Sequence, residues 1–260
     1  MPAIDISHLR TRFDDYKDRY RNIAMRREDG ILELRVHTEG GPLHWGRLPH
    51  AELEEAFLNI GRDRENQVVI LTGTGDAFSG PQVQDSGANR SSHRLTQDEW
   101  AELAWESKGL LSNMLSIDCP MIAAVNGPAL RHPELPAMCD IVLAAPTASF
   151  QDSAHFNGGL VPGDGVHVVF SLIMGLNRAR YFLMTGQELT AEQAREAGLV
   201  NEIVPADRLL HRAWAHARRM LEQPEMNRRF ARTLITEQLR RQINDLLPYG
   251  LALEALAATR

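Results

Sequence analysis

A loop that leads into a predicted helix carries residue types that can do chemistry. It reads NGPALRHPELPAMCD and spans residues 126–140. A loop in this position can offer backbone N–H groups to a ligand, but Pro128 and Pro133 have no N–H to donate. His132 stands next to Pro133, and an imidazole ring can donate or accept a hydrogen bond. The His-Pro step therefore marks this loop as a candidate site.

A second histidine is followed by an acid further along the chain. His155 comes after an apolar stretch, and Asp164 lies nine residues later in a PGDG turn. A buried carboxylate beside an imidazole fixes its tautomer and stabilises the imidazolium that forms on proton uptake. A lone histidine is more often structural, however, and an aspartate in such a turn usually bonds its own backbone. The residue types alone leave both interpretations open.

The composition bounds the class of protein. With 260 residues, 43% hydrophobic and 24% charged, the chain can form one large globular domain or two small ones. A net charge of -6 argues against nucleic acid as a partner, because phosphate binding needs a basic surface. The two cysteines form no disulfide framework, and no ligand cluster has metal-binding spacing. We therefore expect a reducing cytoplasm and no metal.

Targeting signals are not expected. Residues 1–28 are charged throughout and have no apolar core, so we expect no signal peptide. No run of 18 apolar residues occurs, so we expect no membrane span.

The first half of the chain alternates between strand-like and helix-like patterns. Continuous apolar runs or turn-bounded segments predict strands at 29–38, 66–75, 119–127 and 139–146. Apolar residues at helical spacing predict helices at 49–63 and 97–115. This rhythm implies crossover connections and a largely parallel sheet, which is an α/β fold.

The chain becomes helical after residue 170. Thr190 and Gln193 form a predicted capping box, and Gly198 ends the helix that they begin. Long amphipathic helices are predicted at 207–223 and 226–247. A polar loop at 79–94 is the most irregular segment.

Four motifs stand in the order and spacing of the crotonase (enoyl-CoA hydratase/isomerase) superfamily. They read VVILTGTGDAFSG, AAVNGPAL followed by MCDIVLAA, GGLVPGDG, and TGQELTAEQAREAGLVNEIV. The similarity runs from about residue 20 to the C-terminus. The chain most resembles the 6-oxocamphor hydrolase branch, which hydrolyses a carbon–carbon bond in β-diketones. Trp45 and the segments HPELP, FQDSAHF, PGDG and LEALAA carry this closer resemblance.

This resemblance implies a crotonase-like ββα spiral. Residues 1–200 would form the spiral core with an N-terminal helical extension. Residues 201–260 would form a helical region for oligomerisation. The expected assembly is a homotrimer or a dimer of trimers, acting on a small molecule without a cofactor.

The resemblance also implies carbonyl-binding residues. A typical crotonase binds a thioester carbonyl with two backbone N–H groups, one of which Gly80 can still supply here. The second donor would come from a glycine run that Pro133 and its neighbours replace. His132 lies in that place as a side-chain donor. Trp45 has an indole N–H that only donates, which suits a carbonyl oxygen.

The catalytic residues implied by the resemblance are His155, Asp164 and Glu254. His155 stands where many crotonases carry a catalytic glutamate, and Asp164 would complete a dyad that deprotonates water. Glu254 would hold the water or share the proton transfers. Glu134 matches a second glutamate position of some crotonases but is interpreted as structural.

The expected reaction is a cofactor-free retro-Claisen hydrolysis of a β-diketone, cyclic and blocked from enolising between its carbonyls, to a keto acid. Two alternatives stay open. The first is an acyl-CoA hydratase or isomerase, against which stand Pro133 and the absence of a glutamate at His155. The second is a non-catalytic crotonase-like scaffold, against which stands the number of polar residues placed at the site.

Overall fold

The computed structural model describes residues 10–80 and 95–258, and its core is a mostly parallel sheet. The strands are β1 (Ile23–Glu28), β2 (Ile31–Val36), β4 (Val68–Thr72), β6 (Met121–Val125), β7 (Ile141–Ala144) and β10 (Glu202–Ile203). They lie in the order β1-β2-β4-β6-β7-β10. Only the β1–β2 pair is antiparallel, and the remaining pairs are parallel.

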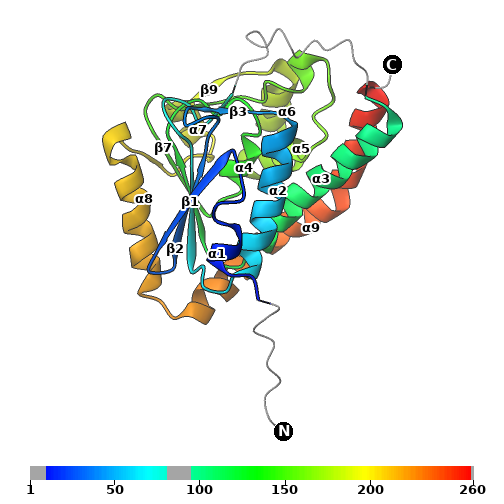
Figure 1. The fold of residues 1–260 in the computed structure, drawn as a ribbon. Helices are drawn as coiled ribbons and strands as arrows, with labels where there is room; N and C mark the ends of the chain where they lie inside the picture. The colour runs from blue at the N-terminus through cyan, green and yellow to red at the C-terminus, as the bar shows by residue number, and fades with distance from the viewer. Residues whose placement is uncertain (1–9, 81–94, 259–260) are drawn as a thin grey trace.

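Both faces of the sheet are covered, as the continuous apolar runs predict (Figure 1). Alternate residues of β4 belong to different apolar clusters, since successive side chains of a strand point to opposite faces. Val69 and Leu71 join the cluster that contains α2 (Arg47–Arg62) and α3 (Gln97–Ser116). Val68 and Ile70 join the cluster under α8 (Ala206–Leu221).

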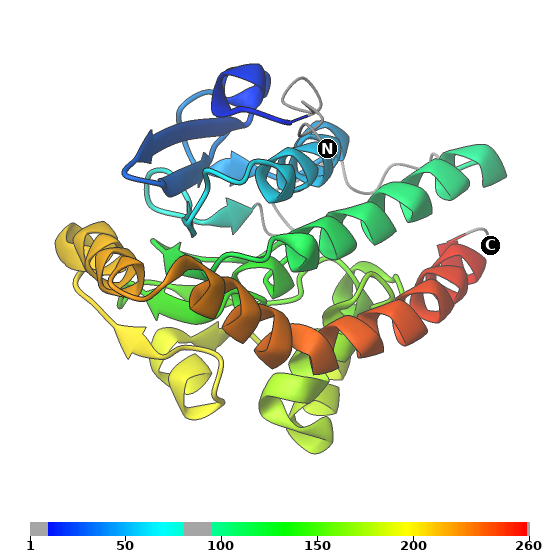
Figure 2. The same ribbon diagram turned by 90° about the horizontal axis from the view of Figure 1, so that it is seen from below.

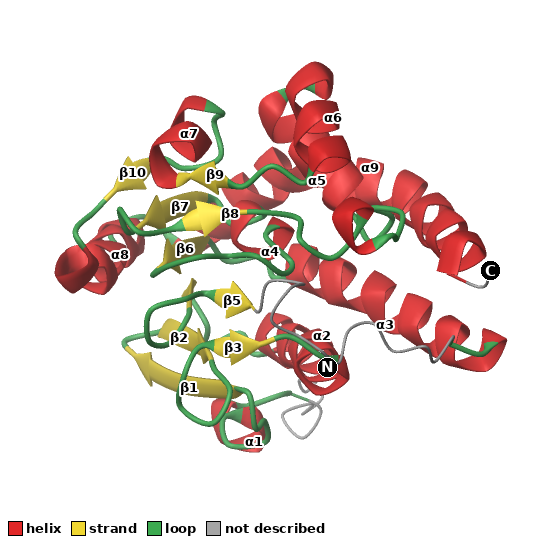
Figure 3. Cartoon of the chain, turned by 90° about the horizontal axis from the view of Figure 1, so that it is seen from above, coloured by secondary structure: helices red, strands yellow, loops and turns green. Residues whose placement is uncertain are grey.

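Short strands form a second layer beside the main sheet (Figure 3). β3 (Leu43–His44) pairs in parallel with β5 (Ser79–Gly80), and β8 (Ser149–Phe150) pairs antiparallel with β9 (Leu189–Thr190). Isolated bridges link Ala129 to both Ser79 and Phe150. The segments that follow β3, β6 and β8 are thereby held side by side.

The remaining helices connect these layers. They are α1 (Phe13–Tyr16), α4 (Glu134–Ala137), α5 (Val166–Met174), α6 (Leu176–Thr185), α7 (Ala191–Glu196) and α9 (Glu225–Ala258), with a short 3-10 turn η2 (Phe156–Gly158). α9 runs along α3 and α5 (Figure 2). Its Arg229 is paired with Asp118 at 2.5 Å, and its Arg232 with Asp140 at 2.9 Å. These buried arginines fix the long helix against the core.

The predicted elements are confirmed with shifted ends. The helix predicted at 97–115 is α3, and Thr190 and Gln193 make the predicted capping box of α7. The helix predicted to end at residue 247 continues through Pro248 to Ala258. The division at residue 200 stays a prediction, and the polar loop lies outside the described residues from 81 to 94.

The helices within 10–80 and 95–258 include none that is long and apolar enough to cross a membrane.

Candidate active site

The predicted site residues meet around one small cavity of about 190 Å³. It lies where the segments after β3, β6 and β8 face α2, α3 and α9. Its lining includes Trp45, His132, His155, Asp164 and Glu254. Five of the six residues expected at the site from the sequence are therefore brought together by the fold.

Gly80 is the sixth, and it is not among the described residues that line this cavity. It ends β5, where its carbonyl accepts a 2.7 Å hydrogen bond from the backbone N–H of Trp45. Gly80 thus positions the segment that carries Trp45, and its own contact with a substrate stays a prediction.

The loop that carries His132 is tied to the layer of short strands. The N–H of Leu130 donates to the carbonyl of Ser79 at 2.8 Å, and the hydroxyl of Ser79 donates to the carbonyl of Arg131 at 2.6 Å. His132 itself has a φ of 48°, in the left-handed region. A non-glycine residue there costs about 1–3 kcal/mol and persists only where its surroundings fix it. Pro133 then begins the turn into α4.

His132 is held by an acid on one side and an aromatic ring on the other. Its Nδ1 lies 2.6 Å from Oε1 of Glu134, which is fully buried. Trp45 stacks on the imidazole with ring centroids 4.0 Å apart. Burial opposes a charge on the ring, but Glu134 and Asp164 raise the pKa of His132 above its ordinary value. When the ring is protonated, both of its nitrogens carry a proton, and Nε2–H can donate to an oxygen while Nδ1–H is held by Glu134. Glu134, interpreted from the sequence as structural, therefore supports a donor.

His155 has a carboxylate at each ring nitrogen. Its Nδ1 lies 2.7 Å from Oδ1 of Asp152, and its Nε2 lies 3.3 Å from Oδ2 of Asp164. Burial opposes the charged ring, but Asp164 and then Asp152 raise the pKa of His155 well above its ordinary value. The predicted pairing with Asp164 is present, while Asp152, which the sequence reasoning missed, holds the other nitrogen.

Asp164 connects the two imidazoles. Its Oδ2 also lies 3.6 Å from Nδ1 of His132. Burial works against its charge, but His155 and His132 hold the pKa of Asp164 well below its usual range. One ionised aspartate thus stabilises the protonated form of both rings.

A close contact between two glycines sets the position of Glu254 relative to His155. A Cβ on Gly163 would lie 2.3 Å from the carbonyl oxygen of Gly250 in α9, and one on Gly250 would lie 2.3 Å from that of Gly163. Only glycines allow the turn and the helix to approach this closely. Glu254, one helical turn after Gly250, is thereby placed with Oε1 3.8 Å from Nε2 of His155.

Glu254 holds a proton at neutral pH. Burial, and then the negative charge of Asp164, raise its pKa to about 8. A neutral carboxyl group can donate a hydrogen bond to an oxygen, which a carboxylate cannot.

Replacing Glu254 with Gln should raise the melting temperature in a pH-dependent way. The raised pKa means that its stabilising contribution is complete below about pH 4.5 and is lost as pH rises towards about 8. The neutral amide avoids this loss. We expect little difference at pH 5 and a gain of roughly 5 °C at pH 8, followed by calorimetry. An equal shift at both pH values would contradict the raised pKa.

His50 is a cavity residue that the sequence reasoning missed. It lies on the same buried face of α2 as the apolar Leu53 and Phe57. A histidine at helical spacing from these apolar residues was the signal that the sequence offered. Its Nδ1 is 3.2 Å from Oε2 of Glu106, and its Nε2 is 3.3 Å from the hydroxyl of Ser107. Burial first, and the charge of His132 second, lower its pKa to about 3. His50 is therefore a neutral ring at neutral pH.

The arrangement does not fit a tetrahedral zinc ion. His132, Glu134 and Asp164 are the one group of potential ligands found within the described ranges. Two atoms bound to a tetrahedral zinc stand about 3.4 Å apart, because each lies about 2.1 Å from the ion. The 2.6 Å between His132 and Glu134 is too short for this and is that of a charge-assisted hydrogen bond.

Comparisons with known proteins agree on the family. Residues 49–256 match the sequence profile described as enoyl-CoA hydratase/isomerase. A probable enoyl-CoA hydratase of Mycobacterium tuberculosis is 32% identical over 171 residues, which is 65% of this chain and 60% of that protein. The chain thus covers less than two thirds of that relative's length.

The likeness to solved structures extends over nearly the whole chain, as two of them show. One is ABDH, a β-diketone hydrolase from the cyanobacterium Anabaena sp. PCC 7120 bound to (S)-3-oxocyclohexyl acetic acid. It is 44% identical, with a TM-score of 0.88, over 94% of this chain and 97% of that one. The other is an enoyl-CoA hydratase/isomerase from Mycobacterium paratuberculosis. It is 26% identical, with a TM-score of 0.85, over 94% of this chain and 96% of that one.

Proposed function

The chain belongs to the enoyl-CoA hydratase/isomerase family, the crotonases, and from that premise we propose that it hydrolyses a carbon–carbon bond in a β-diketone without a cofactor. The observation that carries the proposal is the buried imidazole of His155 between Asp152 and Asp164. An imidazole held in this way can deprotonate water. The likeness to a β-diketone hydrolase of 44% identity supports the same assignment.

The first chemical step is the attack of water. With Nδ1–H donated to Asp152, the lone pair on Nε2 of His155 takes a proton from water, and the hydroxide oxygen bonds to one carbonyl carbon. The proton stays on His155 as imidazolium, which the carboxylates of Asp152 and Asp164 stabilise. Glu254, which is protonated at neutral pH, donates to the oxygen that becomes negative.

The second step breaks the carbon–carbon bond. The tetrahedral intermediate collapses to a carboxylic acid, and the electron pair of the broken bond becomes an enolate on the second carbonyl. His132 as an imidazolium, together with the indole N–H of Trp45, stabilises that enolate oxygen. The proton on His155 then passes to the enolate carbon. A keto acid leaves and His155 is neutral again.

The alternative function is an acyl-CoA hydratase or isomerase, as in many relatives. Pro133 has no N–H for a thioester oxyanion hole, and its neighbour His132 occupies the cavity wall instead. A His–Asp pair also replaces the carboxylate expected for hydration. Both features favour the diketone.

A paired incubation tests the proposal. The first substrate is a bicyclic eight-carbon diketone whose two carbonyls flank one bridgehead carbon, and the second is crotonyl-CoA. We expect mass spectrometry to show the diketone gaining one water and crotonyl-CoA unchanged. Hydration of crotonyl-CoA alone would support the acyl-CoA alternative, and no reaction of either would support a non-catalytic scaffold.

The pH profile of kcat/KM should be displaced towards alkaline pH. His155 must be neutral to accept a proton, and its pKa lies well above 6.5 because of Asp164 and Asp152. Activity should therefore fall as pH is lowered through a value above 6.5. Above about pH 8, the loss of the proton on Glu254 should lower it again. Because His155, Asp164 and Glu254 interact, the pKa values read from the acid and alkaline sides of the profile belong to the group and not to single residues. An acid limb centred below pH 6 would contradict the account.

The product should be formed with one handedness. Trp45 and His132 line one side of the cavity, so the two carbonyls of a prochiral diketone meet different groups. We expect one enantiomer of the keto acid in more than tenfold excess, which needs about 1.4 kcal/mol between two transition states. Replacing Trp45 with Phe should lower kcat/KM about tenfold and erode this excess. A racemic product from the unmodified protein, seen by chiral chromatography, would rule out the two donor roles.

We also propose that the chain assembles as a homotrimer or a dimer of trimers. Phe230, Leu234 and Ile235 of α9 are 64%, 77% and 76% exposed, and a stretch of apolar surface of this kind favours association. Light scattering should give three or six times 29.1 kDa, and a monomer at micromolar concentration would contradict this.

A further inference from the structure

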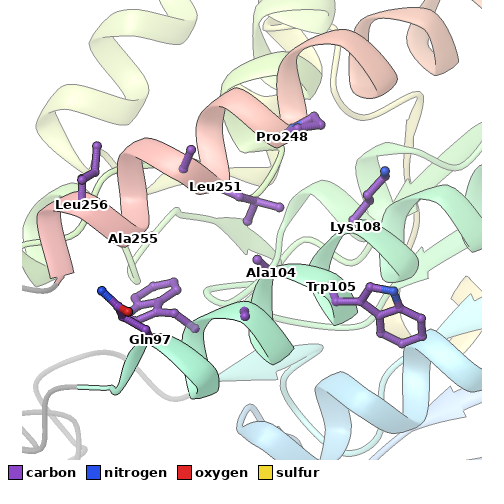
Figure 4. Close-up of a pocket in the computed structure, with 11 residues that line it drawn as sticks. Gln97, Ala104, Trp105, Lys108, Pro248, Leu251, Ala255 and Leu256 are labelled. Atoms are coloured by element: carbon purple, nitrogen blue, oxygen red, sulfur yellow. The ribbon is translucent and has the colours of Figure 1, made fainter.

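A second and larger hollow lies next to the catalytic cavity. It is a groove of about 640 Å³ between the first half of α3 and the last turns of α9. Figure 4 shows Gln97 and Ala104 of α3 across from Leu251 and Ala255 of α9. The groove is lined mainly by alanine, leucine and tryptophan side chains, so it suits an apolar group.

Two side chains line both the groove and the cavity. They are Trp100 of α3 and Leu251 of α9, and each is more than nine-tenths buried. Leu251 lies three residues before Glu254 on α9, so the partition stands directly beside the catalytic carboxyl group. The two hollows are therefore neighbours that share these side chains in their walls.

The size of the catalytic cavity suggests that the two hollows work together. Binding sites for small molecules usually measure about 300–1,000 Å³. The cavity of about 190 Å³ falls below this range, whereas the groove adds about 640 Å³. A substrate that fills a site of ordinary size would extend from the cavity into the groove.

Trp100 is packed in a way that leaves a polar group of its side chain unsatisfied. Its indole N–H is buried and has no hydrogen-bond partner in residues 10–80 and 95–258. Most buried indole N–H groups find a partner, because leaving one unpaired is unfavourable. A rotation of this side chain would connect the cavity with the groove and would present its indole N–H to a bound molecule.

We propose that the groove is a substrate subsite that receives an apolar substituent of the diketone, with Trp100 and Leu251 as the residues that control entry. This inference rests on the proposed function and adds the class of substrate to it. The preferred diketone carries an alkyl or ring substituent remote from its two carbonyls. The reacting carbonyls stay beside His155, while the substituent lies between α3 and α9.

A series of diketones with substituents of increasing length tests the inference. Each methylene group that enters the groove should raise kcat/KM about fourfold, until the groove is full. Replacing Ala252, an exposed residue of the groove, with Trp should flatten this dependence. The neighbouring Leu253 lies outside the groove lining, so Leu253→Trp is the matched control and should keep the full dependence. For each variant, every kcat/KM value is divided by that variant's kcat/KM for the smallest diketone before the dependences on substituent length are compared.

The outcomes separate this inference from the proposed function. Turnover of the smallest diketone with no gain from longer substituents would overturn the subsite and leave the proposed function in place. A gain that survives Ala252→Trp would also overturn it, because the substituent would then lie elsewhere. Retention of the gain together with dissociation of the assembly in Ala252→Trp, seen by light scattering, would assign the groove to a second copy of the chain. No turnover of any diketone would overturn the proposed function, and the subsite with it.

Discussion

His155→Ala should lower kcat for a diketone by a factor of about a hundred to ten thousand, the usual contribution of a general base. The imidazole is the group whose nitrogens meet Asp152 and Asp164 inside the cavity, and alanine cannot take a proton from water. The fold should survive, because His155 precedes the short turn η2 and is not part of either apolar cluster. Steady-state kinetics and a melting curve measure both quantities.

His211→Ala is the matched control for this variant, since His211 is exposed on α8 and lies outside the cavity lining. It should keep the full rate. If His155→Ala retained more than about a tenth of kcat, its loss would be smaller than a general base contributes and the assignment would be wrong.

Asp152→Asn should be nearly as damaging, with a loss in kcat on the order of a thousandfold or more. The carboxylate at 2.7 Å fixes the proton of His155 on Nδ1 and leaves Nε2 to accept one from water. An amide can donate to Nδ1 and so favour the opposite tautomer, which has no lone pair on the reacting nitrogen. In serine proteases this kind of replacement costs about ten-thousandfold.

The control for Asp152→Asn is Asp207→Asn, at an exposed position in the first turn of α8. Nuclear magnetic resonance of the imidazole nitrogens can observe the tautomer directly. A variant with the altered tautomer and an unchanged rate would show that Asp152 has no part in orienting the base. Asp164→Asn should also be severe, but it additionally removes a charge beside His132.

Much of the fold follows from local sequence patterns. The segment that forms β6 is wholly apolar and the one that forms β4 has a single polar residue, Thr72, so both must be covered on both faces. The capping box at Thr190 is likewise a local arrangement of two side chains. The grouping of His132, His155, Asp164 and Glu254 was expected only through the resemblance to the crotonases, because they come from segments far apart in the chain.

Other features of the site depend on contacts that no local pattern specifies. Asp152 reaches Nδ1 of His155 because the chain after β8 is extended beside the loop of residues 129–131, to which it is hydrogen-bonded. His50 enters the cavity wall because α2 packs on α3. The close approach of Gly163 and Gly250 is visible only when α9 is in place. Each of these results from tertiary packing, which periodicity and capping rules do not encode.

The central claim is that water, activated at His155, becomes part of the acid formed when a carbon–carbon bond breaks. It is tested most directly by turning over the bicyclic diketone in water enriched in the heavy isotope of oxygen and analysing the product by mass spectrometry. The account predicts a keto acid that carries one heavy oxygen in its carboxyl group, formed by the unmodified protein and not by His155→Ala. A product without heavy oxygen in the carboxyl group, or equal product from both proteins, would contradict it.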